Sequence, residues 1–417
     1  MSAAHAGGGA HAWRQAVLAV NAGSSSLKFA LYPQYGGQVA PACLSGHIEG
    51  LEEGGSPALL LHRQGGAIRR ALSLPGGDRF EQALEALSGV LAHDRDAVRI
   101  SAVAHRIVHG GERFTDSVVL DDAALAYLAG LSPLAPLHQP HNLAGVHAFR
   151  RSYPQLPQVG CFDTGFHASI PQVEQMFALP RALRDAGLRR YGFHGLSYRY
   201  VSRQLRRHSA RARSRMLVAH LGNGASACAV KDGKSAATTM GFCALDGLMM
   251  GTRSGAIDPG VLLYLLRAGW QVDELERTLY RESGLRGVSG LSADMRTLAA
   301  SKDPEAALAI DLFAHRLVRE CGALAACLGG LDVLAFTGGI GEHDASMRQR
   351  ACDGLAYLGV RVDPRANVRA CGTAIERIDA PASAVEVWVV PTDEGLVAAG
   401  DAARLTTSTG AAPAERL

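Results

Sequence analysis

The segment between residues 21 and 28 has the composition of a phosphate-binding turn. It contains Asn21-Ala-Gly-Ser-Ser-Ser-Leu-Lys28 and so combines backbone N–H groups, three hydroxyls and a lysine. Such groups can surround a phosphate chain. A second glycine turn, Thr337-Gly-Gly-Ile-Gly-Glu342, follows an apolar run, and we expect it to lead into a helix near Asp344. Backbone there could approach an anionic or planar ligand closely, although serine and glycine turns also occur in loops that bind nothing.

Two arginines stand where a permanent charge is costly. Arg106 lies inside the apolar run Val103–Val108, and Arg253 lies among small and apolar residues in Met249–Gly255. A guanidinium in such surroundings needs an anionic partner, most often a structural carboxylate. In a chain that also carries phosphate-binding turns, the two arginines suggest a clamp on a phosphoryl group during its transfer.

Two histidines and two acids complete the chemically interesting set. His194 is followed by Gly195, and His138 lies between prolines in Pro136-Leu-His-Gln-Pro140. A lone histidine is usually structural, but a neighbouring glycine favours a functional role. Asp163 and Glu394 each follow an apolar strand-like run. Carboxylates at strand ends can hold a metal close to a reacting group.

The composition limits the class of protein. The chain has 417 residues, which is comfortable for two domains, with 47% apolar and 19% charged residues. A net charge of +3 and only 6% aromatic residues argue against a nucleic-acid or membrane partner. The eight cysteines form no CxxC pair and the first residues do not resemble a signal peptide, so we expect free thiols and a cytoplasmic protein.

Strand–turn patterns recur in the second half of the chain in the same order. The matching pairs are residues 17–32 with 216–230, 103–111 with 332–339, and 158–163 with 386–394. Between them, residues 305–328 have apolar positions at helical spacing and stop at Gly329-Gly330. Any long α/β chain can show one such coincidence, but three in order predict two α/β domains of one topology. A ligand is then expected in the cleft between the domains, facing the glycine turns.

The expected domain boundaries follow from these repeats. We expect a flexible extension over residues 1–14 and an N-terminal domain over residues 15–165, completed by residues 396–417. Residues 166–395 are expected to form the C-terminal domain, which would bind nucleotide and carry the dimer contact.

Eight motifs in their order resemble those of the acetokinase family, the acetate kinases. They are NAGSSSLKF, HRIVHGG, FDTGFH, RRYGFHG, HLGNGAS, GLMMGTRSG, FTGGIGE and TDE. The resemblance runs from about residue 15 to the C-terminus, and GLMMGTRSG and RYGFHG are highly specific. It implies the fold of the acetate and sugar kinase, Hsp70 and actin superfamily, with two duplicated actin-like (ribonuclease H-like) domains and an active site in the interdomain cleft.

The resemblance also implies roles for the reacting groups. Arg106 would bind the substrate carboxylate and Arg253 the phosphoryl group in flight. Asp163 would be the acid at the reaction centre, and His194 would stabilise charge on the phosphoryl group. Residues expected to line the apolar substrate pocket are Val108, Leu137, His138, Phe193 and Ala244.

The same resemblance assigns the nucleotide and metal ligands. Asn21 and Glu394 would hold Mg²⁺, with Mn²⁺ as an alternative. The expected ATP or ADP contacts are Ser24, Ser26, Lys28, His220, Leu221, Gly222, Asn223, Gly224, Asp294, Met295, Arg296, Gly339, Ile340, Gly341, Glu342 and His343. The first eight would lie at the phosphates, whereas residues 294–296 and 339–343 would hold adenosine. Transfer would be direct and in line, without a covalent enzyme intermediate.

The chain departs from the family pattern at a few positions. Ala244 stands where the family usually has proline, which leaves the substrate length open. His343 replaces the usual asparagine, which leaves nucleotide selectivity open. Tyr198 occupies the histidine position of the family's GTSH, and Gln139 stands for the asparagine of HNP. None of these changes removes a charged catalytic residue.

The resulting expectation is a phosphotransferase that converts ATP and acetate into acetyl phosphate and ADP. Propionate is the nearest rival substrate, and a homodimer is expected because the family forms one. An ATP-switched binding module like actin or Hsp70 would leave Arg106 and Arg253 without a role. A sugar kinase would need a polar pocket, whereas the residues assigned here are mostly apolar.

Overall fold

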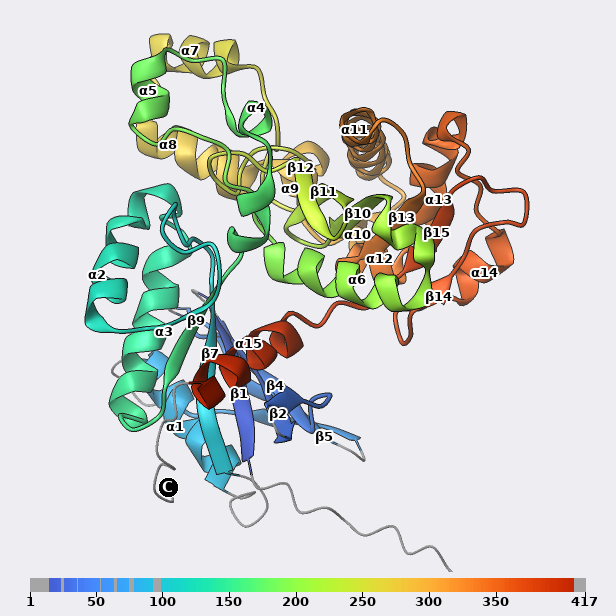
Figure 1. Cartoon of the computed structure of the whole chain (residues 1–417). Coiled ribbons are helices and arrows are strands. Elements are labelled where there is room, and N and C mark those ends of the chain that lie inside the picture. Colours follow the sequence, from blue (N-terminus) through green and yellow to red (C-terminus); the bar gives the residue numbers. More distant parts are fainter. Residues whose placement is uncertain are drawn as a thin grey trace, which may run out of the picture. The chain divides into compact units, whose positions relative to one another are not determined.

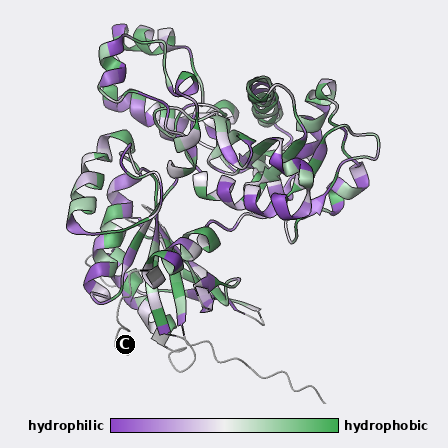
Figure 2. Ribbon diagram, in the orientation of Figure 1, coloured by the Kyte–Doolittle hydropathy of each residue, from purple (hydrophilic) through white to green (hydrophobic). Residues whose placement is uncertain are grey.

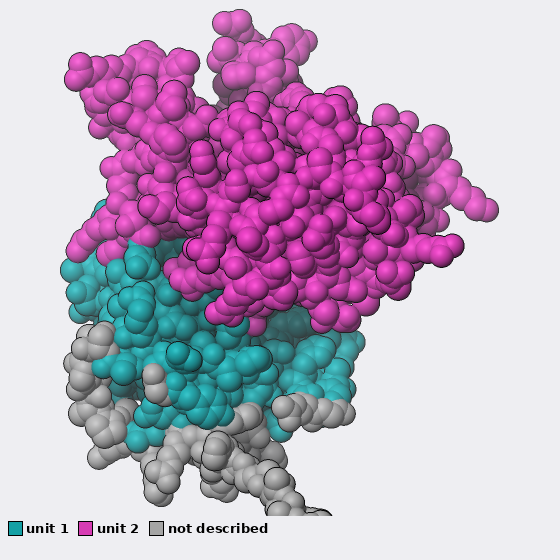
Figure 3. Space-filling view, turned by 45° about the vertical axis from the view of Figure 1, so that its right-hand side comes forward, with its two compact units in different colours: residues 1–108, 116–162, 395–417 teal, residues 109–115, 163–394 magenta. Residues whose placement is uncertain are grey.

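The computed structural model describes residues 15–23, 26–35, 37–52, 54–63, 66–74, 79–92 and 99–408. The chain divides into two compact units (Figure 3). Unit 1 contains residues 1–108, 116–162 and 395–417, and unit 2 contains residues 109–115 and 163–394. The expected extension over residues 1–14 and the expected phosphate ligand Ser24 lie outside the described residues.

Unit 1 is built on a nine-stranded mixed sheet whose main path runs β6-β5-β4-β2-β1-β7-β9-β8. β1 pairs antiparallel with β2, while β7 pairs parallel with both β1 and β9 (Figure 1). The strand bounds are β1 Gln15–Ala22, β2 Ser26–Tyr35, β3 Gln38–Val39, β4 Leu44–Glu49, β5 Ala58–Arg63, β6 Gly66–Ala71, β7 Arg99–Ile107, β8 Val118–Val119 and β9 Gln158–Phe162.

Unit 2 is built on a six-stranded sheet in the order β12-β11-β10-β13-β15-β14. β10 pairs antiparallel with β11, and β13 pairs parallel with β10 and β15. The strand bounds are β10 Arg215–Leu221, β11 Ala225–Lys231, β12 Lys234–Thr238, β13 Val333–Thr337, β14 Glu376–Arg377 and β15 Glu386–Val389.

The two sheets repeat one topology, which confirms the predicted duplication. β4-β2-β1-β7-β9-β8 in unit 1 corresponds strand for strand to β12-β11-β10-β13-β15-β14 in unit 2. The central strands β9 and β13 are buried along their whole length and β7 along most of it, as expected for parallel strands that helices cover. In each copy the turns that carry the motifs follow these central strands or join the hairpin beside them.

In the described part of the chain, fifteen α-helices accompany the sheets. Their bounds are α1 Arg79–Ala92, α2 Asp122–Gly130, α3 Gln139–Ser152, α4 Gln172–Gln175, α5 Arg181–Asp185, α6 Gly195–His208, α7 Pro259–Arg267, α8 Val272–Arg277, α9 Gly284–Ser289, α10 Met295–Ala300, α11 Pro304–Leu328, α12 Gly338–His343, α13 Ala345–Gly354, α14 Pro364–Arg369 and α15 Glu394–Ser408. No described helix is long and apolar enough to cross a membrane.

Helix α11 shows how local sequence sets these bounds. The Asp303 side chain accepts a hydrogen bond from the Glu305 N–H, and Pro304 occupies the first helical position. Gly329 ends the helix in the left-handed conformation, with φ of 71°. The helix is predominantly hydrophobic (Figure 2) and packs on β10, β11 and β12. It spans the segment that apolar periodicity predicted.

Three local features differ from the sequence-based expectation. β1 extends to Ala22, so Asn21 lies in the strand and not in the turn. Residues 338–343 already form the short helix α12, because Glu342 Oε1 accepts a hydrogen bond from the Gly338 N–H at 2.8 Å and closes the turn. Strands β3 to β6 in residues 38–71 were not predicted; β6 is an exposed edge strand without a buried face, so its sequence has no apolar alternation.

Candidate active site

The hairpin of β1 and β2 places two predicted phosphate and metal ligands opposite each other. Asn21 is the cross-strand partner of Lys28, so the two side chains emerge on the same face of the hairpin. The Gly23 N–H donates to the Ser26 carbonyl at 2.9 Å and closes the connection. Lys28 is exposed, which leaves its ammonium group available for an anion.

One buried side chain that the sequence did not single out joins three functional segments of unit 1. Asn142 Oδ1 accepts a hydrogen bond from the Val108 N–H at 2.9 Å, and its Nδ2 donates to the Ala22 carbonyl at 2.7 Å. Asn142 lies in α3, whose N-terminal cap is His138. It therefore ties together the ends of β1 and β7 and the helix that follows Leu137 and His138. An asparagine inside an amphipathic helix carries no motif, so only its contacts identify it.

In unit 2, His194 begins α6 in a strained backbone conformation. It adopts φ of 59° and ψ of 24°, the left-handed region that non-glycine residues rarely occupy. The following Gly195 donates its N–H to the Asp163 carbonyl at 2.9 Å, and a Cβ at this glycine would lie 2.3 Å from that oxygen. Glycine is therefore required at 195, and this contact places the backbones of His194 and Asp163 side by side.

The His194 imidazole has defined partners. Its Nδ1 lies 2.8 Å from Ser226 Oγ in β11, and its ring stacks on His220 with a centroid separation of 4.3 Å. His220 Nδ1 lies 2.8 Å from Ser197 Oγ, which lies 3.0 Å from Thr392 Oγ1. Two charged imidazoles at this separation would repel each other, so the stack suits at most one protonated ring.

The glycine turns after β10 and β13 lie against each other. His220 and Thr337 are register partners in the parallel pair of strands. Gly338 has φ of 76°, and a Cβ there would lie 2.8 Å from the Leu221 carbonyl oxygen. A Cβ at Gly222 would lie 3.9 Å from the Gly339 nitrogen, and one at Gly224 would lie 3.5 Å from His194 Nε2. These close approaches bring the predicted nucleotide turns Leu221–Gly224 and Gly339–Glu342 together beside His194.

The Glu342 side chain connects the start of α12 to the segment before α15. Its Oε1 accepts hydrogen bonds from the N–H groups of Gly338 and Thr392, at 2.8 and 3.1 Å. Thr392 precedes the predicted metal ligand Glu394 by two residues. Glu394 is the first residue of α15, and thus lies farther from the end of β15 than the sequence suggested.

Arg253 is held by a residue of the predicted substrate pocket. Its Nη1 donates to the Ala244 carbonyl at 3.0 Å, and its side chain is half-buried. Tyr280 lies beside Cys243 and Arg253, where burial raises the pKa of its hydroxyl well above the usual value despite the nearby guanidinium. The hydroxyl therefore stays protonated. Phe193 and Ala244 are both buried.

Asp294 caps a helix and also forms an ion pair. Its Oδ1 accepts from the backbone N–H groups of Arg296 and Thr297, and its Oδ2 lies 2.7 Å from Arg296 Nη2. The hydrogen bond with Arg296 is the main cause that lowers the pKa of Asp294 to about 2. Met295 is buried, whereas the Arg296 side chain is largely exposed. The segment thus presents charged groups at the start of α10.

Arg348 is a second residue that the sequence analysis missed. It is fully buried, yet its guanidinium donates to the carbonyls of Gly341, Glu342, Asn367 and Ala370 and to Asn367 Oδ1, at 2.6 to 3.0 Å. Five carbonyl acceptors satisfy its donors and locate its positive charge. Arg348 therefore joins the end of α12, which carries the predicted adenosine contacts, to α14. At the same end, the Nδ1–H of His343 donates a hydrogen bond to the Cys371 carbonyl at 2.8 Å.

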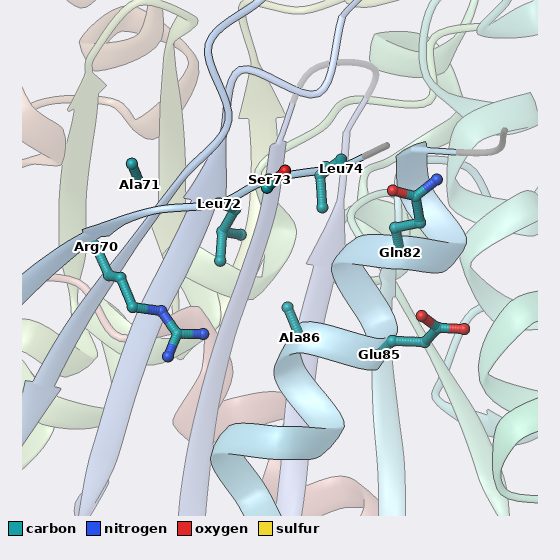
Figure 4. Close-up of a pocket in the computed structure, with 8 residues that line it drawn as sticks. All are labelled: Arg70, Ala71, Leu72, Ser73, Leu74, Gln82, Glu85 and Ala86. Carbon is teal, nitrogen blue, oxygen red and sulfur yellow. The ribbon is translucent and has the colours of Figure 1, made fainter. Parts of the chain in front are cut away.

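A pocket in unit 1 lies away from the predicted site residues. It has a volume of about 430 Å³ and is lined by β6, the segment after it and α1, with Arg70, Ser73, Gln82 and Glu85 as its polar residues (Figure 4). None of the predicted catalytic, substrate or nucleotide residues lines it.

The predicted residues thus fall into two sets, one in each unit. Those of unit 1 are Asn21, Ser26, Lys28, Arg106, Val108, Leu137 and His138. Those of unit 2 are Asp163, Phe193, His194, His220, Leu221, Gly222, Asn223, Gly224, Ala244, Arg253, Asp294, Met295, Arg296, Gly339, Ile340, Gly341, Glu342, His343 and Glu394. Arg106 lies in β7 with Cys161 of β9 as its register partner.

Comparison with known proteins decides the family. The model of the Acetokinase family matches residues 16–400. This chain belongs to the acetokinase family. An acetate kinase of Rhodopseudomonas palustris is 50% identical over 393 residues, covering 93% of this chain and 98% of the relative. An acetate kinase of Methylocella silvestris is 46% identical over 391 residues, covering 92% and 96%.

Solved structures of the acetokinase family have the same fold. A propionate kinase from Francisella tularensis superposes with a TM-score of 0.84 at 35% identity, covering 93% of this chain and 98% of that one. Porphyromonas gingivalis acetate kinase superposes with a TM-score of 0.82 at 37% identity, covering 94% and 99%. The two duplicated α/β domains expected from the resemblance are therefore confirmed.

Proposed function

We propose that this chain transfers the γ-phosphoryl group of ATP to acetate, giving acetyl phosphate and ADP in a reversible reaction. The observation that carries the proposal is the 50% identity to an acetate kinase over 93% of the chain. It is supported by the cluster of His194, the Leu221–Gly224 turn and the Gly338–Glu342 turn, which offers backbone donors and an imidazole to a phosphate chain.

The proposed roles of the side chains follow from their chemistry. Arg106 binds the acetate carboxylate, because a planar guanidinium matches two carboxylate oxygens. Val108, Leu137 and Phe193 offer apolar surface to the methyl group. Arg253 and His194 hold the phosphoryl oxygens as charge develops on them, and Asp163 lies at the reaction centre. Positioning and electrostatics supply the catalysis, so no covalent intermediate with the enzyme is needed.

A divalent cation belongs to the proposal. Asn21 and Glu394 carry hard oxygen donors, the type of ligand that Mg²⁺ prefers, and Mn²⁺ is compatible with them. Mg²⁺ usually takes only one or two protein ligands and completes its shell with water and phosphate oxygens, so few protein donors are needed. Bound there, the ion would neutralise charge on the nucleotide phosphates.

Propionate is a second proposed substrate. A structural relative with a TM-score of 0.84 is named a propionate kinase. Ala244 has only a methyl group where the family motif has a proline ring, and its side chain is buried. The space so released suits one or two additional methylene groups.

Assembly as a homodimer is proposed from an exposed apolar surface on unit 2. Helix α7 contains Val261, Leu263, Tyr264 and Leu266, and none of its residues is buried. Further exposed apolar side chains lie on α4, α5 and α8 and in the segments beside these helices and before α7, namely Val173, Met176, Leu179, Leu183, Ile257 and Val272. Apolar surface of this extent favours a protein partner, and we propose a second copy of the chain. A cytoplasmic location is proposed because all eight cysteines are free thiols.

The function is tested by trapping acyl phosphate with hydroxylamine. The purified chain is given Mg-ATP with acetate, propionate, butyrate or glycerol in turn. We expect acyl hydroxamate with acetate and propionate, strict dependence on ATP and on Mg²⁺ or Mn²⁺, and no ADP release with glycerol. Release of ADP with glycerol, without hydroxamate from any acid, would refute the proposal in favour of a sugar kinase.

A further inference from the structure

The hydroxyl of Tyr198 extends the hydrogen-bonded chain behind His194. Ser226 Oγ lies within hydrogen-bond distance of both His194 Nδ1, at 2.8 Å, and the Tyr198 hydroxyl. Tyr198 lies in α6, one helical turn after His194, and its side chain is fully buried, as is Ser226. Three polar groups are thus lined up in the order Tyr198, Ser226, His194.

The positions of the protons along this series of hydrogen bonds follow from the number of donors. If Tyr198 donates to Ser226, the Ser226 proton is available for His194 Nδ1, and each hydroxyl proton has an acceptor. In the reverse order, Nδ1–H donates to Ser226 and Ser226 donates to Tyr198, so the tyrosine proton needs another acceptor in a fully buried place. A buried donor without a partner is costly, so the first order is favoured.

Two observations concern Tyr198 itself, one its proton and the other the orientation of its ring. Burial raises the pKa of the Tyr198 hydroxyl well above its usual value, so the group stays protonated. The Tyr198 ring is also fixed in orientation, since His167 contacts it edge-on with a centroid separation of 5.6 Å. His167 itself bonds to the Phe193 carbonyl and to Ser235, at 2.9 and 2.8 Å.

The opposite ring nitrogen of His194 faces the predicted phosphate turn. A Cβ at Gly224 would lie 3.5 Å from Nε2 and 3.7 Å from Cε1. With Nδ1 acting as acceptor, Nε2 must carry the proton of the neutral ring. A neutral imidazole so oriented can donate to a phosphate oxygen near Gly222–Gly224.

We propose that Tyr198 is a positioning residue for phosphoryl transfer, acting through Ser226 to keep His194 in the tautomer whose Nε2–H faces the Gly222–Gly224 turn. The inference deepens the proposed function and rests on it for its kinetic consequence. It also concerns a position at which this chain departs from the family motif.

The kinetic test compares Tyr198→Phe with Tyr200→Phe. Both variants lose one hydroxyl from the same helix. Tyr200 is only half-buried, however, and its hydroxyl is hydrogen-bonded to the Gln204 side chain. Loss of the hydrogen bond should lower kcat of Tyr198→Phe by about 3- to 10-fold, with the KM for acetate and ATP little changed. Tyr200→Phe should retain kcat, and melting curves show whether each variant is folded.

A second variant separates positioning from general packing. In a Ser226→Ala background the hydrogen bonds between Tyr198 and His194 are already lost. Adding Tyr198→Phe should therefore leave kcat unchanged within about twofold, because residues in one network have non-additive effects. Equal losses from Tyr198→Phe with and without Ser226 would overturn the proposal, as would an undiminished kcat in folded Tyr198→Phe.

Nitrogen NMR of ¹⁵N-histidine-labelled protein tests the tautomer without any assay. The His194 signals are identified by their loss in His194→Gln. We expect Nδ1 to have the shift of an unprotonated nitrogen in the natural chain and Tyr198→Phe to change the tautomer populations. A protonated Nδ1 in the natural chain contradicts the inference. Because this readout does not need activity, failure of the inference is distinguished from failure of the proposed function, which the hydroxylamine assay decides alone.

Discussion

Single charges are the first determinants of the proposed chemistry. One guanidinium nitrogen of Arg253, Nη1, donates a hydrogen bond to the Ala244 carbonyl. This contact fixes the direction of the remaining guanidinium nitrogens. Arg106 has a defined place in β7, a central strand of unit 1. A phosphoryl group in transfer carries negative charge, and preorganised guanidinium groups stabilise it more strongly in a dry site than in water.

Replacing either arginine should therefore be severe. Arg253→Ala and Arg106→Ala are each expected to lower kcat by about 10²- to 10³-fold, the usual effect of removing one preorganised donor. Lysine should rescue poorly because it lacks the planar fork. Arg281→Ala is a control, since Arg281 is exposed on the helical turn Thr278–Glu282. Near-normal turnover in Arg253→Ala would show that its role is misassigned.

The chain-length preference is a second property set by one residue. Ala244→Pro should shift the ratio of kcat/KM values, propionate over acetate, toward acetate by about 10-fold or more, because one methylene group changes discrimination by about 10- to 200-fold. Catalysis with acetate should persist, since no charged group is lost. The ratio is measured in the natural chain and in the variant. A preference for acetate that the substitution does not change would mean that a neighbour such as Cys243 or Phe193 fills the space.

At the scale of elements, hydrogen bonds of buried or half-buried side chains hold the functional turns. Asn142 connects β1, β7 and α3, Glu342 connects α12 to the segment before α15, and Arg348 connects α12 to α14. Short turns that begin or end a strand have little stability of their own. These side chains therefore decide where the ligand-binding backbone lies.

Arg348 provides the test of this view. Arg348→Met leaves several buried carbonyls without donors and should lower the free energy of unfolding by about 3 kcal/mol or more. In protein that stays folded at low temperature, the KM for ATP should rise while the KM for acetate changes little, because α12 carries the predicted adenosine contacts. Thermal melts and initial rates measure both effects. Equal increases in the two KM values would argue against a local role at the nucleotide turn.

At the scale of the whole molecule, the apolar surface around α7 is expected to be buried between two copies. Tyr264→Glu places a charge in this surface and should convert the dimer to a monomer, as measured by sedimentation velocity. Tyr357→Glu is a matched control, because Tyr357 is 71% exposed and Tyr264 is 70% exposed. A natural chain that sediments as a monomer, or a Tyr264→Glu variant that remains a dimer, would contradict the assignment of this surface.

Acid sensitivity is the second property of the whole molecule. Burial lowers the pKa of His105 in unit 1 and of His167 in unit 2 to about 4, below the usual 6.5. The unfolded chain therefore binds more protons than the folded one between these values. The stability is fully present above about pH 6.5 and is lost as the pH falls through about 4, by roughly 3 kcal/mol at most per histidine.

Chemical denaturation between pH 7.5 and pH 4.5 measures this loss. His105→Gln removes one titrating group, and its stability should fall less steeply with decreasing pH, even though the variant is less stable at pH 7.5. Parallel curves for the natural chain and His105→Gln would show that His105 does not contribute to the acid sensitivity.

The sequence alone determined the family, the duplicated topology and the identity of most proposed site residues. Glycine turns after apolar strands and charged residues inside apolar runs are local signals, and periodicity located α11 to within one residue. The motif order then indicated the acetokinase family, which the family match over residues 16–400 confirms.

Only the tertiary structure revealed the residues whose hydrogen bonds position the candidate site. Asn142 and Arg348 belong to no motif, and Ser226 ends the HLGNGAS motif but had no predicted role. Asn367, a partner of Arg348, lies 19 residues away, and Ala22, a partner of Asn142, lies 120 residues away. Short edge strands such as β6 also escaped prediction, because an exposed strand has no apolar alternation. Both failures have one physical reason: buried hydrogen bonds and strand pairing join residues distant in the chain, whereas propensity and periodicity describe only neighbours.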